Sequence, residues 1–136
     1  MRTIATKTFI LILAQSNPLN FIQGTKISLE DVLSQGNRKE FHHIFPKAYL
    51  KSFGDKYKDE QINCLANFSI LSRTDNNKIK DQPPSKYRSE MPVNNQEFAK
   101  ILATHFCPDD MVKNDYDNFL QSRAGLLLVR AKELSQ

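Results

Sequence analysis

The sequence predicts an α+β fold that is mostly helical, with a small module of two strands and one short helix near the middle of the chain. Apolar residues recur at helical spacing through the last third, over residues 95–134. β-branched and aromatic residues gather in two short stretches, residues 39–45 and 62–72. An apolar run over residues 3–15 ends before Pro18, as expected of a helix.

Helices are predicted on both sides of the central module. The apolar run at the start is hydrophobic on nearly every side, which indicates a helix packed inside the protein. Ser28 as an N-cap predicts a second short helix, so the N-terminal helical part spans residues 3–35. In the last third, one helix is predicted over residues 95–106 and a longer one over residues 115–134. His105 lies on the apolar face of the first of these and is expected to be a core or edge histidine and not a metal ligand.

The central module is read from the order of its segments. These are a strand (39–45), one or two helical turns (47–53), a charged loop (55–61), a second strand (62–72) and a short helix (74–81). Thr74 or Asp75 is expected to cap this helix, and the prolines at 83 and 84 cannot continue it. We therefore expect a hairpin-plus-helix module within residues 39–87, with the flanking helices packed around it.

Composition and charge fit a single globular domain over all 136 residues. Hydrophobic residues make up 40% of the chain and charged residues 25%, which is enough apolar material for a core. The net charge is +4, and residues 38–90 carry the whole of it, with 11 Lys and Arg against 7 Asp and Glu. A basic excess confined to the segment that carries the central module favours a polyanionic partner.

The cysteines and the N-terminal run exclude several classes of protein. Cys64 and Cys107 are far apart and form no CxxC pair, so the chain has neither a disulfide framework nor a zinc ribbon. The apolar run over residues 9–14 is too short to span a bilayer and is followed by no convincing signal-peptide cleavage site. We therefore expect a cytoplasmic protein without a membrane partner.

The most informative stretch is EFHHIFPKAYL, where His42 and His43, two of the three histidines, stand side by side. Asn67 follows in the second predicted strand, and Asn76 lies nine residues further on. In this order and spacing, residues 39–87 resemble the HNH endonuclease motif, which is a ββα-metal site. They most resemble the HNH segment of GmrSD-like bacterial restriction proteins. The letters LSRTDNN also resemble the matching part of the HNH domain in CRISPR effector nucleases.

The resemblance implies a role for each matching residue. His43 corresponds to the motif histidine that acts as the general base, and His42 to the preceding metal ligand, which is more commonly an aspartate. Asn67 matches the middle asparagine, which holds the loop and strand around the base, and it joins His43 in the catalytic group. Asn76 matches the last position, a second metal ligand. The CRISPR-type register would place this ligand at Asn77 instead.

The implied chemistry is hydrolysis of a DNA phosphodiester bond with the help of one divalent metal ion. A base must take a proton from water, and histidine titrates near neutral pH. The metal ion stabilises developing negative charge. Mg²⁺ is the expected ion, with Mn²⁺, Ni²⁺ or Zn²⁺ as alternatives because His42 is a softer ligand than aspartate. Candidate phosphate contacts near the motif are Lys47, Arg73, Lys78 and Lys80.

The same resemblance implies the effector domain of a bacterial restriction or phage-defence system. In such systems a ParB-like nucleotide-binding domain belongs to the same chain or to a neighbouring one. One alternative is a non-catalytic DNA-binding or interaction domain that retains the HNH fold. Another is a structural zinc domain, although the spacing of its ligands fits no familiar zinc pattern. Those ligands would be His42, His43, Cys64 and Cys107.

Overall fold

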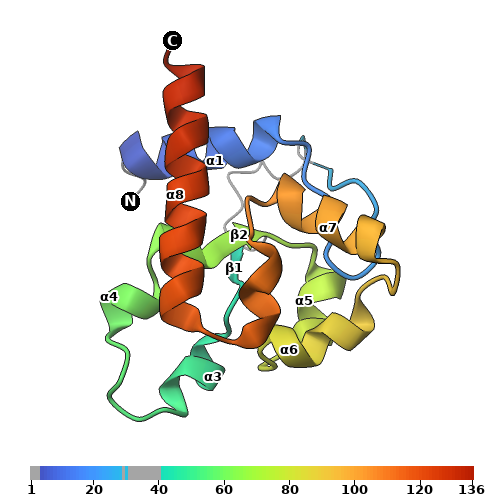
Figure 1. Ribbon diagram of the computed structural model, residues 1–136, viewed down its shortest axis with the longest axis vertical. Helices are drawn as coiled ribbons and strands as arrows, with labels where there is room; N and C mark the ends of the chain where they lie inside the picture. Colours follow the sequence, from blue (N-terminus) through green and yellow to red (C-terminus); the bar gives the residue numbers. More distant parts are fainter. Residues whose placement is uncertain (1–3, 29, 31–40) are drawn as a thin grey trace.

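A two-stranded antiparallel hairpin lies at the centre of a mostly helical structure (Figure 1). Strand β1 (Phe41–His43) pairs with β2 (Phe68–Ile70), and His42 stands opposite Ser69. The arrangement confirms the predicted α+β fold, mostly helical with a small hairpin. The computed structural model describes residues 4–28, 30 and 41–136.

Short helical segments fill the chain between and after the two strands. Between them lie α3 (Lys47–Lys51), α4 (Asp59–Ile62) and the 3₁₀ turn η2 (Leu65–Asn67). After β2 come α5 (Arg73–Ile79), α6 (Pro84–Tyr87), η3 (Arg88–Glu90), α7 (Asn95–Thr104), η4 (Asp109–Lys113) and α8 (Tyr116–Leu134). The predicted short helix before the prolines and the two C-terminal helices are confirmed to within about two residues at each end.

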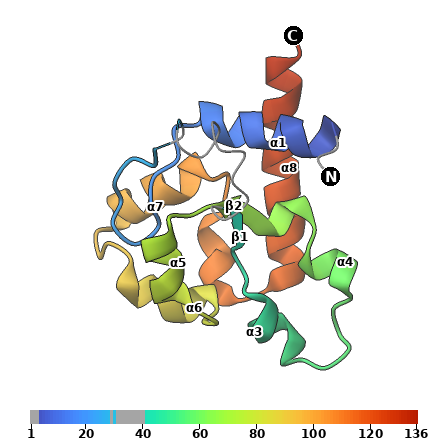
Figure 2. The same ribbon diagram turned by 180° about the vertical axis from the view of Figure 1, so that it is seen from behind.

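Helix α1 (Ile4–Gln15) packs against the body of the protein with one side only. Ile4 and Leu11 are exposed, so the prediction of a helix is confirmed but the prediction that it is buried on nearly every side is wrong. Both views show α1 crossing α8 at one end of the molecule, which lets its apolar residues meet the body from a single side (Figures 1 and 2). The side chains that it buries are Phe9, Ile10, Ile12 and Leu13.

Helix α8 is buried mainly over its first half, where Tyr116 and Phe119 join the core. Leu127 still packs against the apolar cluster around Phe9, whereas Leu134 is exposed. Figure 1 shows the last turns of α8 extending past α1. The predicted apolar face is therefore wrong at the C-terminal end of the helix. In the described part of the chain, no helix is both long and apolar enough to cross a membrane.

The second strand is shorter than predicted. It begins only at Phe68, because Ile62 ends α4 and Asn67 ends the turn η2. The predicted charged loop becomes helical from Asp59 onward.

The start of α5 also differs from the prediction. Ser72 caps this helix in place of Thr74 or Asp75, because its hydroxyl oxygen accepts a hydrogen bond from Asp75 N at 3.1 Å. Most of the predicted helix that begins at Ser28 lies outside the described residues, as do residues 39–40 of the first predicted strand.

A buried arginine ties α8 to the segment before β2. The guanidinium of Arg123 donates hydrogen bonds to the backbone carbonyls of Ala66 (2.7 Å), Phe68 (2.6 Å) and His105 (3.0 Å). Burial lowers the pKa of Arg123, because a charged group is less stable away from water. The carbonyl oxygens offset this cost with the negative ends of their dipoles. The central hairpin is thereby fixed to the long helix.

Candidate active site

The histidine pair lies at the end of β1, where the chain leaves the hairpin toward α3. Side chains of neighbouring strand residues point to opposite faces, yet His42 and His43 line one surface pocket of about 220 Å³. The backbone bends at the two residues after His43, as the sequence requires if both histidines are to serve one site. We call this cavity the histidine pocket. Its other lining residues are Pro46, Lys47, Ala48, Asn76, Lys80 and Asp81.

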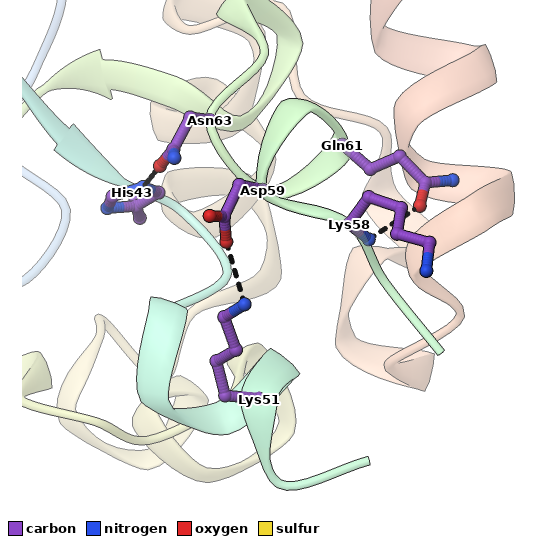
Figure 3. Close-up of polar contacts among 6 residues, drawn as sticks. All are labelled: His43, Lys51, Lys58, Asp59, Gln61 and Asn63. Carbon is purple, nitrogen blue, oxygen red and sulfur yellow. Dashed lines mark hydrogen bonds and ion pairs between the residues drawn. The ribbon is translucent and has the colours of Figure 1, made fainter. Parts of the chain in front are cut away.

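Two contacts hold the ring of His43. Its Nε2 lies 2.9 Å from Asn63 Oδ1, and an amide oxygen only accepts hydrogen bonds, so Nε2 carries a proton and donates it to this contact. The ring centroid lies 4.4 Å from that of Phe68, with the planes tilted by 38°. In the neutral form of a ring held this way Nδ1 is the proton acceptor, which is the arrangement that a general base needs. Figure 3 shows Asn63 facing His43 from the end of α4.

Asn67 joins the two ends of the connection between the strands. Its Oδ1 accepts a hydrogen bond from Phe45 N at 2.9 Å, and its Nδ2 donates to Phe45 O and Ile62 O, both at 3.0 Å. The residue is fully buried, so it can influence chemistry only by fixing the chain that follows His43. It also ends the turn η2, whereas the sequence placed it in the second strand.

Helix α5 brings Asn76 to the histidine pocket. Asn76 is partly buried and lines the pocket, whereas Asn77 is exposed and lies outside the lining. One step along a helix turns a side chain by about 100°, so the two asparagines face different surroundings. The helix is anchored by buried Ile79 and by Asp75, whose Oδ2 accepts a hydrogen bond from Ile22 N at 2.9 Å. The geometry favours the register that uses Asn76.

Two of the four candidate phosphate contacts lie at the histidine pocket. Lys47 begins α3 and Lys80 follows α5, and both line the pocket. Arg73 and Lys78 are exposed on α5 and lie outside the lining. The structure therefore separates two lysines at the pocket from two cations on the neighbouring surface.

Helix α4 connects the site to α3. Asp59 Oδ1 lies 2.7 Å from Lys51 Nζ, on the same side of α4 as Asn63 (Figure 3). The hydrogen bond from Lys51 lowers the pKa of Asp59, because it stabilises the charged carboxylate. This exposed ion pair helps to hold the helix that carries the partner of His43.

Sequence reasoning missed two polar residues of this region. Asn63 carries no sequence signal, because its role depends on the fold bringing the end of α4 to β1. Asp81 follows Lys80, which has a φ of 52° and turns the chain sharply at the end of α5. The sequence did offer a signal for Asp81, because a carboxylate stands just after the helix that carries Asn76.

The donor atoms of the histidine pocket fit a hard divalent cation. His42 offers an imidazole nitrogen, Asn76 an amide oxygen and Asp81 a carboxylate oxygen. Mg²⁺ and Mn²⁺ take mostly oxygen ligands, completed by water and phosphate. Over residues 4–28, 30 and 41–136, no three side chains of His, Cys, Asp or Glu come together as a metal cluster. An ion here would therefore depend on Asn76 and on oxygens from water and substrate.

The structural zinc alternative finds no support in the part of the chain that the structure describes. The described residues form no cluster of His42, His43, Cys64 and Cys107. Cys64 Sγ lies 3.2 Å from Gln61 O, and Cys107 is buried in the main core. Burial raises the pKa of Cys107 to about 11, which disfavours the thiolate that zinc requires.

The Ser69–His105 pair looks like a nucleophile with its base but is closed to solvent. His105 Nε2 donates a hydrogen bond to Leu19 O at 2.7 Å, so Nδ1 accepts one from Ser69 Oγ. Both side chains are fully buried, and burial lowers the pKa of His105 to about 3. The pair joins three segments of the chain, and the predicted core position of His105 is confirmed.

Comparison with known proteins finds a distant relative whose own function is unknown. An uncharacterized protein from Methanocaldococcus jannaschii is 28% identical to this chain in an alignment 123 residues long, and the match covers 70% of this chain. The chain spans about a fifth of the length of that relative. No family model matches the chain, and no solved structure matches it. The site geometry is therefore the basis for assigning a function.

Proposed function

We propose that this chain is a metal-dependent endonuclease of the HNH type, which hydrolyses DNA phosphodiester bonds. One observation carries the proposal. His43, with its Nε2 bound to Asn63, lines the same pocket as His42 and Asn76, so a base and two metal-ligand candidates share one site. The order of these residues along the chain is that of the motif which residues 39–87 resemble.

In the proposed reaction, His43 Nδ1 takes a proton from a water molecule while the water oxygen attacks phosphorus. The bond from phosphorus to one sugar oxygen breaks, and that oxygen leaves and gains a proton from solvent. Asn63 and Phe68 hold the imidazole ring in place, so little reorientation is needed during the reaction. Asn67 supports this arrangement by fixing the backbone that follows His43.

The remaining residues of the pocket serve the phosphate. His42 and Asn76 would hold one divalent ion, with Mg²⁺ expected, and such an ion supplies positive charge against the developing charge on the phosphate. Lys47 and Lys80 attract and orient the DNA backbone at the pocket. Arg73 and Lys78 extend the basic surface along α5.

The wider assignment is to the effector part of a bacterial restriction or phage-defence system. A ParB-like nucleotide-binding domain, in the same or a neighbouring chain, is the proposed partner. The likeness of residues 39–87 to the HNH segment of GmrSD-like proteins supports this assignment. This chain spans about a fifth of the length of its relative, so a similar segment occurs within a longer protein.

Nicking of supercoiled plasmid tests the proposal. The purified chain is incubated with plasmid in Mg²⁺ or Mn²⁺ and, in parallel, in EDTA. The fractions of supercoiled, relaxed and linear plasmid are then measured on an agarose gel. We expect relaxed and then linear DNA with the metal ions and neither product in EDTA. DNA binding without cleavage at any metal concentration would contradict the proposal and favour a non-catalytic DNA-binding domain.

A further inference from the structure

We propose that Asp81 is the anionic ligand of the metal ion in the histidine pocket. The inference rests on the proposed function and deepens it, because it names a ligand that the motif resemblance does not supply. Asp81 is the acidic side chain among the residues that line the pocket. It lies at the end of the helix that carries Asn76.

The charges of the pocket favour such a ligand. His42 and Asn76 are both neutral ligands, whereas Mg²⁺ is usually bound in proteins through one or two carboxylates, with water and phosphate oxygens. Lys47 and Lys80 line the same pocket, and their positive charges oppose the entry of a cation. Without Asp81, the pocket would present two positively charged lysines to a divalent ion and no negatively charged side chain.

The backbone at the end of α5 brings Asp81 to the pocket. Lys80 N donates a hydrogen bond to Asn76 O at 2.9 Å, which closes the last turn of the helix. Lys80 then adopts a φ of 52°, a conformation that is costly for a residue other than glycine. Gln82 N bonds to Ile79 O at 3.1 Å, and Ile79 is buried. Asn76 and Asp81 therefore project from one anchored helix end.

Asp81 is not committed to a lysine. Among the described residues the ion pairs are Lys51–Asp59 and Arg130–Glu133, so neither Lys47 nor Lys80 is paired with Asp81. The two lysines remain free to bind phosphate oxygens, and the carboxylate remains free to bind a cation. A pocket with both kinds of group fits a metal ion that meets a phosphate.

A Mn²⁺ titration without DNA tests the inference. The free ion is followed by electron paramagnetic resonance for the parent chain, for Asp81→Asn and for the matched control Asp55→Asn. Asp55 is also exposed but lies outside the lining of the histidine pocket. Asp81→Asn should weaken Mn²⁺ binding at least about tenfold, since even outer-shell changes cost tenfold or more. Asp55→Asn should leave binding as in the parent, and circular dichroism should show all three proteins folded.

A charge exchange sharpens the test. His42→Asp, added to Asp81→Asn, returns one negative charge to the pocket and should restore much of the Mn²⁺ affinity. A double variant as weak as Asp81→Asn, or an Asp81→Asn protein that binds as tightly as the parent, would overturn the role of Asp81. If the parent protein nicks plasmid in either of these cases, the proposed function stands and only the role of Asp81 is lost. A parent that neither binds Mn²⁺ nor nicks plasmid would instead overturn the proposed function itself.

Discussion

The smallest unit of the proposed mechanism is the contact between His43 and Asn63. The amide oxygen of Asn63 fixes the proton on Nε2, and the ring of Phe68 limits rotation of the imidazole. His42 and Asn76 then complete one pocket with His43. The order and spacing of the motif predicted that these three would lie together, and they line one pocket. Spacing did not identify Asn63, because its contact with His43 depends on how the end of α4 packs beside β1.

Replacement of Asn63 tests whether it positions the base. Asn63→Ala should lower kcat for plasmid nicking by about tenfold to a hundredfold with little change in KM, because the imidazole loses its orientation but the DNA contacts remain. Asn63→Asp keeps an oxygen acceptor and should retain most of the activity. Equal rates for the alanine variant and the parent would show that His43 needs no such support.

The choice between Asn76 and Asn77 is tested by two single substitutions. Asn76→Ala should require roughly tenfold more Mg²⁺ or Mn²⁺ for half-maximal nicking, because a ligand oxygen at the histidine pocket is lost. Asn77→Ala is the matched control, one residue along the same helix and exposed, and should behave like the parent. The reverse pattern would move the metal site by one residue and support the CRISPR-type register.

At the scale of the elements, apolar periodicity predicted which helices form but not where every element begins and ends. Apolar spacing predicted α7 and the first half of α8, because those residues do face the core. The start of β2 was predicted too early, because the side chain of Asn67 holds a turn to Phe45 and Ile62 just before the strand. The exposed end of α8 was predicted as a buried face, since apolar spacing does not show where the neighbouring helix ends.

Among the contacts between elements, the hydrogen bonds of Arg123 are expected to have the largest effect on stability. Arg123→Met keeps the bulk of the side chain but removes donors to Ala66, Phe68 and His105. Hydrogen bonds to a charged group contribute about 1.5–3 kcal/mol each, so the free energy of unfolding should fall by at least about 3 kcal/mol in urea denaturation. Arg130→Met removes an exposed pair with Glu133 and should change it by less than about 1 kcal/mol. Similar small effects for both variants would mean that the buried guanidinium does not fix the hairpin.

For the whole molecule, His105 links the N-terminal loop, the hairpin and the end of α7. Its ring contacts Leu19 O and Ser69, and it meets Phe21 edge-on with the centroids 4.6 Å apart. Sequence periodicity correctly placed this histidine in the core. Its partners could not be predicted, because they come from segments 36 and 86 residues away in the chain.

The buried His105 predicts a loss of stability in acid. Its pKa is about 3 in the folded protein against an ordinary 6.5, so between these values only the unfolded chain binds the proton. The free energy of unfolding should therefore fall as the pH drops below about 6.5, by up to about 1.4 kcal/mol per pH unit from this residue. His105→Gln should be less stable at pH 7, yet lose less stability in acid. Parallel urea-denaturation results for both proteins from pH 4 to 8 would contradict this account of the acid sensitivity.

The most direct test of the proposed chemistry is rescue of a variant that lacks the His43 side chain. His43→Gly should nick plasmid at least about a hundredfold more slowly than the parent in Mg²⁺, because a general base contributes 10²–10⁴-fold. Added imidazole should restore part of the rate, since it can occupy the space of the missing ring and accept the proton from water. A folded His43→Gly protein that nicks plasmid at the parent rate without imidazole would contradict the central claim that His43 activates the water.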